Sequence, residues 1–129
     1  MDKIIDGENV LLRPIQMKDT PLIVKWRNNK NVRKNFVFQE TFTHEMHENW
    51  MRTRVASGDV VQYIIVVKED NFPIGSVYFR DIDSKNRSAE YGIFVGEDLA
   101  RGKGYGSETS RLFVNCRIYK FPIATVRVR

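Results

Sequence analysis

Residues 95–108, Val95-Gly96-Glu97-Asp98-Leu99-Ala100-Arg101-Gly102-Lys103-Gly104-Tyr105-Gly106-Ser107-Glu108, connect a predicted strand to a predicted helix. Three glycines stand at alternate positions in this turn: Gly102, Gly104 and Gly106. Glycines at this spacing allow successive backbone N–H groups to face one way without interference from Cβ atoms. The helix that follows adds its free N–H groups and the positive end of its dipole. We therefore expect an anion site suited to a diphosphate, with Arg101 and Lys103 adding positive charge at its rim.

Two common phosphate-binding motifs do not fit this stretch. A Walker loop needs Gly-x4-Gly-Lys-Ser/Thr, whereas five residues separate Gly96 from Gly102, and Gly104 follows Lys103. A dinucleotide fingerprint needs Gly-x-Gly-x-x-Gly, and here the third glycine comes one residue early, after a predicted β-hairpin. The alternative is a glycine-rich loop that only turns the chain.

The surrounding sequence predicts an α+β domain. Strands are predicted at Val10–Pro14, Gln62–Val67, Ile74–Ile82, Ala89–Val95 and Ile123–Val128, and helices from Asp19 to Arg27, His44–Val55 and Gly104–Tyr119, with an aromatic-bearing loop at Val32–Glu40. The order is therefore β-α-α-β-β-β-α-β. Hairpins in the middle and a helical crossover to the last strand indicate a mixed, mostly antiparallel sheet flanked by helices.

Several motifs in this order resemble one family. The segment Arg101-x-x-Gly104-x-Gly106 resembles the coenzyme A pyrophosphate motif Arg/Gln-x-x-Gly-x-Gly/Ala of the GNAT N-acetyltransferases, and Ala89–Val95 resembles the fourth strand of that family. Leu12-Arg13-Pro14, Trp26-Arg27-Asn28 and Ile74-Gly75 occur where the ribosomal-protein and amino-sugar acetyltransferase branches have similar residues. The resemblance covers about residues 8–119 and implies a GNAT-like acyl-CoA N-acyltransferase fold.

The resemblance implies acetyl-CoA as cosubstrate and a primary amine, on an amino sugar or a protein N-terminus, as acceptor. Backbone groups of Ile93, Phe94 and Val95 would line the pantetheine arm. The diphosphate would be held by Arg101, Gly102, Lys103, Gly104, Tyr105, Gly106 and Ser107. The acceptor would be bordered by Trp26, Asn28, Asn29 and Phe36 after the first helix, and by Arg80 and Asp81 of the central hairpin. Packing in the core is the alternative for Trp26.

Glu90 is the candidate general base, acting through water on the attacking amine. Strand periodicity gives it the same face as Gly92 and Phe94. The alternative is an ordinary strand carboxylate paired with Arg80 or Arg87. Because a neutral amine attacks the thioester directly, catalysis would be mainly positioning and oxyanion stabilisation.

Composition excludes several other classes. The 129 residues include 21 Lys and Arg against 16 Asp and Glu, a net charge of +5. The basic residues are spread along the chain, so we expect no nucleic-acid partner. A single cysteine, Cys116, excludes an internal disulfide framework and an all-cysteine metal site, and no apolar run is long enough to cross a membrane. We expect a cytoplasmic protein without a metal, since His44-Glu45-Met46-His47 is one residue short of the zinc-protease signature and is predicted on a solvated helix face.

The chain departs from the family pattern at its C-terminal end. The family usually continues with a helix carrying Asn-x-x-Ala…Tyr, whose tyrosine protonates the departing thiolate, and with two further strands. We therefore expect one domain, residues 1–129, truncated after the fifth strand, and a homodimer formed through the C-terminal strand. The alternative is a non-catalytic remnant of the fold that binds CoA or a partner chain.

Overall fold

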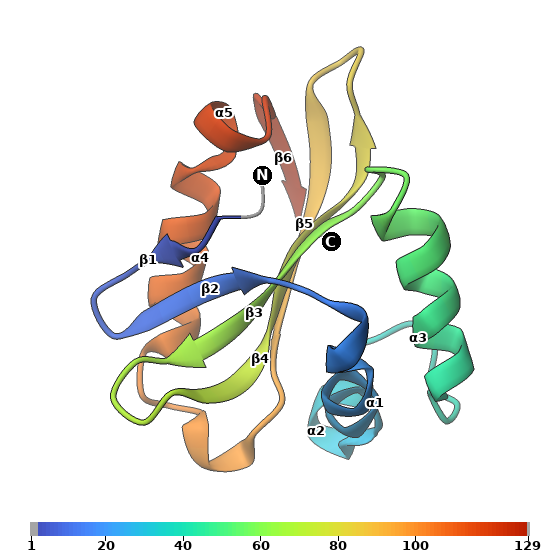
Figure 1. Cartoon of the computed structure of the whole chain (residues 1–129), viewed down its shortest axis with the longest axis vertical. Coiled ribbons are helices and arrows are strands. Elements are labelled where there is room, and N and C mark those ends of the chain that lie inside the picture. Colours follow the sequence, from blue (N-terminus) through green and yellow to red (C-terminus); the bar gives the residue numbers. More distant parts are fainter. Residues whose placement is uncertain (1–2, 129) are drawn as a thin grey trace.

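The computed structural model describes residues 3–128, without the side chains of residues 118 and 119, and its centre is a six-stranded sheet (Figure 1). The strands are β1 (Ile5–Asp6), β2 (Val10–Pro14), β3 (Val61–Val67), β4 (Phe72–Asp83), β5 (Ser88–Val95) and β6 (Thr125–Val128). They lie side by side in chain order. Neighbouring strands are antiparallel except β5 and β6, which are parallel because a helical crossover joins them.

Helices cover both faces of this sheet. They are α1 (Thr20–Asn28), α2 (Lys30–Arg33), α3 (His44–Trp50), α4 (Tyr105–Asn115) and α5 (Arg117–Lys120), with 3₁₀ turns at Met17–Asp19 and Asp98–Ala100 and a π-helical turn at Met51–Val55. α4 and α5 pack on one face, and α1, α2 and α3 lie on the other (Figure 1).

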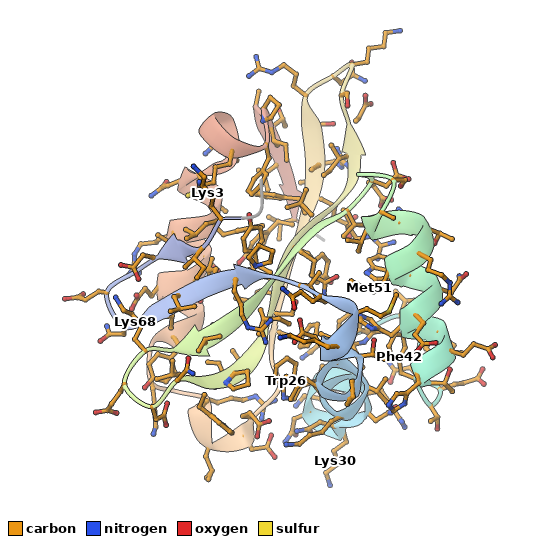
Figure 2. All side chains as sticks on the ribbon, in the orientation of Figure 1. Lys3, Trp26, Lys30, Phe42, Met51 and Lys68 are labelled. Atoms are coloured by element: carbon orange, nitrogen blue, oxygen red, sulfur yellow. The ribbon has the colours of Figure 1, made fainter. Side chains whose placement is uncertain are left out.

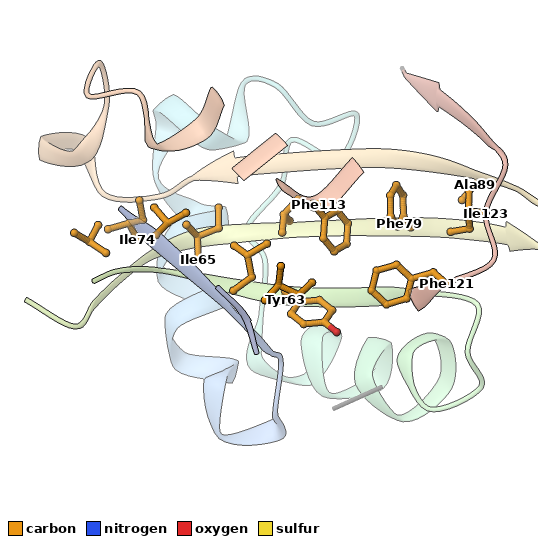
Figure 3. Packing of buried hydrophobic residues seen from close by; sticks show 13 residues of the cluster. Tyr63, Ile65, Ile74, Phe79, Ala89, Phe113, Phe121 and Ile123 are labelled. Atoms are coloured by element: carbon orange, nitrogen blue, oxygen red, sulfur yellow. The ribbon is translucent and has the colours of Figure 1, made fainter. Parts of the chain in front are cut away.

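The core on the α4 side is aromatic. The rings of Phe79 and Phe113 stack with their centroids 4.5 Å apart. Tyr63 meets Phe113 edge-on, and Phe121 meets Phe79 edge-on (Figure 3). Stacked and edge-on aromatic pairs add directional attraction to the hydrophobic gain of burial. This packing fixes α4 against β4 and β5, and so fixes where its first turn lies.

The core on the other face holds α1 and α3 against the sheet. Trp26, Ile64 and Phe94 are buried together there, and the Trp26 and Phe94 rings meet edge-on at 6.3 Å. Figure 2 shows Phe42 and Met51 on the side of α3 that faces α1 and the sheet. This second core therefore fixes the positions of α1 and α3 relative to the central strands.

The predicted fold class is confirmed, with differences at the element ends. The two-residue strand β1 was not predicted, because it is too short to show a period; it is held by a turn in which Gly7 N donates to Val10 O at 2.8 Å. The predicted loop Val32–Glu40 begins inside α2, and the predicted helix Gly104–Tyr119 is split at Cys116 into α4 and α5.

Among the described residues, β6 pairs with the first half of β5. Its register runs from Ser88 to Tyr91, opposite Thr125 to Val128. From Gly92 to Val95, residues of β5 line an open cleft instead. In the part of the chain that the structure describes, Gly92–Val95 of β5 therefore share a cleft with the first turn of α4.

Candidate active site

Glycine conformations shape the turn that leads into α4. Gly102 and Gly104 have φ of +77° and +84°, and no atom lies within 4 Å of a Cβ added at either position. Backbone conformation, not space, therefore requires glycine here. Gly104 is the N-cap residue, and Glu108 N donates to its carbonyl at 3.1 Å. The N–H groups of Tyr105, Gly106 and Ser107 precede that bond, so they have no acceptor within the helix.

The carboxylate of Glu108 does not neutralise this helix end. It accepts hydrogen bonds from Asn9 N at 2.8 Å, Asn9 Nδ2 at 3.0 Å and Val10 N at 3.1 Å. Desolvation raises the pKa of Glu108, but these hydrogen bonds outweigh it and hold the pKa below its usual value. Glu108 thus fastens α4 to the β1–β2 turn, and the positive end of the helix dipole stays available to an external anion.

An open cleft of about 770 Å³ joins the strand edge to this helix end. Nine of the residues predicted to act at the site line it: Glu90, Ile93, Phe94, Val95, Arg101, Gly106, Ser107, Phe36 and Arg80. Of the other predicted residues in the turn, Lys103 and Tyr105 line a separate cavity of about 510 Å³. One cleft therefore contains a free strand edge and a helix N-terminus, which are suited to an extended arm and to a phosphate, respectively.

Arg101 holds the turn against the end of β5. Its Nη2 donates to Val95 O at 2.5 Å, and its Nη1 contacts the carboxylate of Asp98. Hydrogen bonds from Arg101, Asn29 and Asn31 lower the pKa of Asp98. The positive charge of Arg101, expected at the rim of the anion site, lies in the cleft. Its contacts with Val95 and Asp98 also hold the loop against β5.

Trp26, predicted to border the acceptor, is fully buried and lines neither this cleft nor the cavity beside it. Its Nε1 donates to Glu97 Oε2 at 2.7 Å, and its ring lies so close to Gly96 that a Cβ there would be 2.1 Å away. Trp26 therefore acts as a packing residue that ties α1 to the loop after β5, which was the alternative for it.

Asn28, Asn29 and Asp81 also serve the framework. The Asn28 side chain makes two hydrogen bonds with the backbone of Phe42: it accepts from Phe42 N at 2.7 Å and donates to Phe42 O at 2.8 Å. Asn29 Nδ2 donates to Gly96 O at 3.3 Å and to Asp98. Asp81 pairs with Arg54 at 2.6 Å, and it lines neither the cleft nor the cavity beside it. These three hold the elements around the site, whereas Phe36 and Arg80 face it.

A second cavity of about 270 Å³ opens beside the cleft on the α1–α3 side. Four side chains line both spaces: Phe36, Tyr78, Arg80 and Phe94. The rest of the second lining comes from α1, α3, the loop between α2 and α3, and Gln62 of β3, and it includes Arg27, Phe42 and Trp50. We call this space the side cavity.

His47 was predicted on a solvated helix face, and that prediction is wrong. The residue is 1% exposed and lines the side cavity, while the neighbouring Met46 is 41% exposed. The His47 ring reaches Thr20 Oγ1 with Nδ1 at 2.9 Å. Desolvation, with a further contribution from the charge of Arg27, lowers the pKa of His47 to about 4. The imidazole is therefore neutral at pH 7.

Glu90 lies in the cleft and opposite Arg80 in the β4–β5 register. The expected alternation is confirmed, since Phe94 packs in the α1–α3 core while Tyr91 packs against the α4 core. Sequence reasoning missed four further polar lining residues, Asn31, Asn35, Ser110 and Arg111. Ser107, Ser110 and Arg111 recur at spacings of three and four on α4, a signal that was present in the sequence.

The comparisons with known proteins agree with this geometry. The family described as the acetyltransferase (GNAT) domain matches residues 9–129. The chain belongs to this family. An uncharacterized protein of Methanocaldococcus jannaschii is 31% identical over 113 residues, which cover 85% of this chain and 22% of the relative. The alpha/beta-tubulin-N-acetyltransferase 9 of Drosophila melanogaster is 28% identical over 119 residues, which cover 84% of this chain and 59% of the relative. The chain thus spans less than two thirds of either relative.

Solved GNAT structures share the fold. RimL, a ribosomal L7/L12 alpha-N-protein acetyltransferase in complex with coenzyme A, has a TM-score of 0.82 at 17% identity, covering 98% of this chain and 73% of RimL. The spermidine N-acetyltransferase of Vibrio cholerae, in complex with CoA and spermine, has a TM-score of 0.80 at 18% identity, covering 93% of this chain and 70% of its own. At such identities the likeness concerns the fold alone.

Two features are absent from the described residues. Within residues 3–128 no helix is long and apolar enough to cross a bilayer. The same part of the chain contains no group of three or more His, Cys, Asp or Glu residues that could hold a metal ion.

Proposed function

We propose that this chain transfers an acetyl group from acetyl-CoA to a primary amine, on an amino sugar or a protein N-terminus. The observation that carries the proposal is the single cleft in which the Gly92–Val95 edge of β5 and the first turn of α4 lie together. Backbone groups of Ile93, Phe94 and Val95 hold the pantetheine arm. The diphosphate is held at the α4 N-terminus, with residues 101–107 forming its cradle.

In the proposed reaction, the neutral amine nitrogen attacks the thioester carbonyl carbon. A C–N bond forms, the C–S bond breaks, and a backbone N–H of β5 stabilises the oxyanion between these events. Glu90 takes the proton from the amine through water, and the CoA thiolate leaves and is protonated. Positioning supplies most of the acceleration, because the two reactants meet in adjoining cavities.

Calorimetric titration of the purified chain with acetyl-CoA tests the proposal. We expect micromolar binding that is lost in a Gly104→Glu variant, because a carboxylate at the helix N-terminus repels the diphosphate. Absence of binding by the intact chain would contradict the proposal and favour a non-catalytic remnant of the fold. Acetylation of amines is then measured by mass spectrometry of the products.

We propose in addition that two copies associate through β6, in the cytoplasm. β6 is the edge strand of the described sheet, and Val128 on it is 77% exposed. An exposed strand edge is a surface that pairs readily with another strand. Size-exclusion chromatography with light scattering should show a dimer; a clean monomer at micromolar concentration would exclude this association.

A further inference from the structure

The polar atoms of the side cavity define the kind of molecule that fits it. His47 lines the cavity and is buried, and its Nε2 has no hydrogen-bond partner among the described residues. A buried polar atom without a partner is costly, so it marks a place where an occupant supplies one.

The tautomer of His47 follows from its neighbour. Thr20 Oγ1 lies 2.8 Å from Met17 O, which can only accept, so the single hydroxyl proton of Thr20 is donated there. Thr20 must then accept at its contact of 2.9 Å with His47 Nδ1, and Nδ1 carries the ring proton. Because the ring is neutral, Nε2 carries a lone pair and accepts a hydrogen bond. The occupant must therefore bring a donor, such as a hydroxyl or an amide N–H.

The charge of the side cavity is positive. Arg27 and Arg80 line it, and its lining includes no Asp or Glu among the residues described. The guanidinium of Arg27 stacks on two rings, with its carbon 3.8 Å from the Phe36 centroid and 4.3 Å from the Phe42 centroid. Stacking holds the guanidinium plane in position and leaves its N–H groups for an anion. Burial lowers the pKa of Arg27, and a nearby anion would offset that desolvation.

Arg80 contributes from the sheet side. Its Nε lies 3.4 Å from Asp81 Oδ2, and Asp81 is outside the cavity. Since Arg80 lines both the cleft and the side cavity, its charge is at their junction. A polyamine would place several positive charges beside these two arginines, which is electrostatically unfavourable.

Resting on the proposed function, we propose that the acceptor amine belongs to a molecule that donates a hydrogen bond to His47 Nε2 and carries a phosphate or carboxylate beside Arg27 and Arg80. His47 and the two arginines are then specificity-determining residues. Polyamines are excluded by the same groups. A sugar phosphate and an acidic peptide share this chemistry, and the probes below separate them.

The test is calorimetric titration of acceptor probes onto protein saturated with CoA, which keeps phosphate probes out of the diphosphate site. The probes are glucosamine 6-phosphate, glucosamine, the dipeptide Ser-Asp and spermidine. We expect one of the two anionic probes to bind at least tenfold tighter than glucosamine and spermidine. The tighter of the two identifies the source of the anion.

Single-residue variants show which side chains produce the differences in affinity between the probes. Arg27→Gln should weaken binding of the anionic probe about tenfold and leave binding of glucosamine unchanged. His47→Phe should weaken binding of both sugars about tenfold. Thr20→Val should reproduce His47→Phe, because the ring then loses the partner that fixes its tautomer. Arg52→Gln is the matched control, since Arg52 is an exposed arginine that lines neither space. Thermal unfolding of each variant checks that it folds.

The CoA titration and the probe titrations answer different questions. Failure of CoA to bind contradicts the proposed function, and the same probe titrations on the free protein then decide the inference alone. Tighter binding of spermidine than of either anionic probe, no binding of any anionic probe, or anion binding unchanged in Arg27→Gln and His47→Phe would overturn it.

Discussion

Replacing Gly104 with alanine tests whether the conformation of the turn before α4 contributes to folding stability or to the affinity for acetyl-CoA. The residue has φ of +84°, and no atom lies within 4 Å of the added Cβ, so the substitution creates no clash. The cost is conformational, because an L-residue in the left-handed region is disfavoured by about 1–2 kcal/mol. That energy corresponds to a factor of about 5–30 in an equilibrium constant.

The cost appears in one of two measurements. If the variant loop keeps its conformation, the free energy of unfolding falls by about 1–2 kcal/mol and the Kd for acetyl-CoA is unchanged. If the free loop relaxes, stability is preserved, but binding must restore the strained conformation and the Kd rises by about 5- to 30-fold. The sum of the two free-energy changes is therefore about 1–2 kcal/mol in either case.

Gly58→Ala is the matched control. Gly58 has φ of +86°, an added Cβ there also meets nothing within 4 Å, and it lines neither the cleft nor the side cavity. Both variants carry the same change in unfolded-chain entropy, so that effect cancels in the comparison. Gly58→Ala should lose stability only. Urea unfolding and acetyl-CoA calorimetry measure both quantities. The reasoning is refuted if Gly104→Ala changes neither quantity, or if Gly58→Ala weakens acetyl-CoA binding as much as Gly104→Ala does.

Three further results are expected. Trp26→Phe should lower the unfolding free energy by about 1–3 kcal/mol in urea, because Glu97 loses a buried donor; an unchanged midpoint would show that this bond is not stabilising. Phe113→Ala should cost about 3–5 kcal/mol in thermal unfolding, since it empties the centre of the α4-side core; a loss below 1 kcal/mol would contradict the packing described. His47 has a folded-state pKa of about 4, below its unfolded value of 6.5, so its protonation favours the unfolded state. Stability should therefore be complete above pH 6.5 and fall by up to about 3 kcal/mol as pH falls to 4, with a flatter profile in His47→Phe; identical profiles would exclude His47 as the cause.

The central strands could be predicted because each carries its own pattern. β3 contains the continuous apolar run Tyr63–Val67, and β4 and β5 are separated by strong turn residues, so their positions could be predicted from local sequence alone. The turn before α4 could also be predicted from local sequence, because glycines at alternate positions favour a turn. β1 could not be predicted, because two residues contain no period and their pairing depends on the turn around Gly7.

The buried environment of His47 could not be predicted from local sequence. An apolar side chain at Met46 favours that residue for the buried face, whereas His47 of α3 and Met51 of the π-helical turn after it, four residues apart, are the buried ones. A histidine is buried only where its ring finds a partner, and that partner is Thr20, 27 positions earlier. Likewise, the sequence indicated a charge at Arg101 but not its bond to Val95 O, which depends on how the loop folds back onto β5.

Among the described residues, the cleft and the side cavity share four lining side chains, Phe36, Tyr78, Arg80 and Phe94. The groups proposed for the donor come from β5, the turn after it and α4, while six of the twelve described residues that line the side cavity come from the segment between Phe36 and Trp50. That half of the lining lies in a stretch of sequence separate from the one proposed to hold the donor. Divergence within residues 36–50 would reshape that half of the side cavity, including the position of His47, while Arg27, Arg80 and the groups proposed for the acyl donor stay unchanged. A graft of that segment between homologues would therefore change the fit of the acceptor without changing the proposed anion contacts.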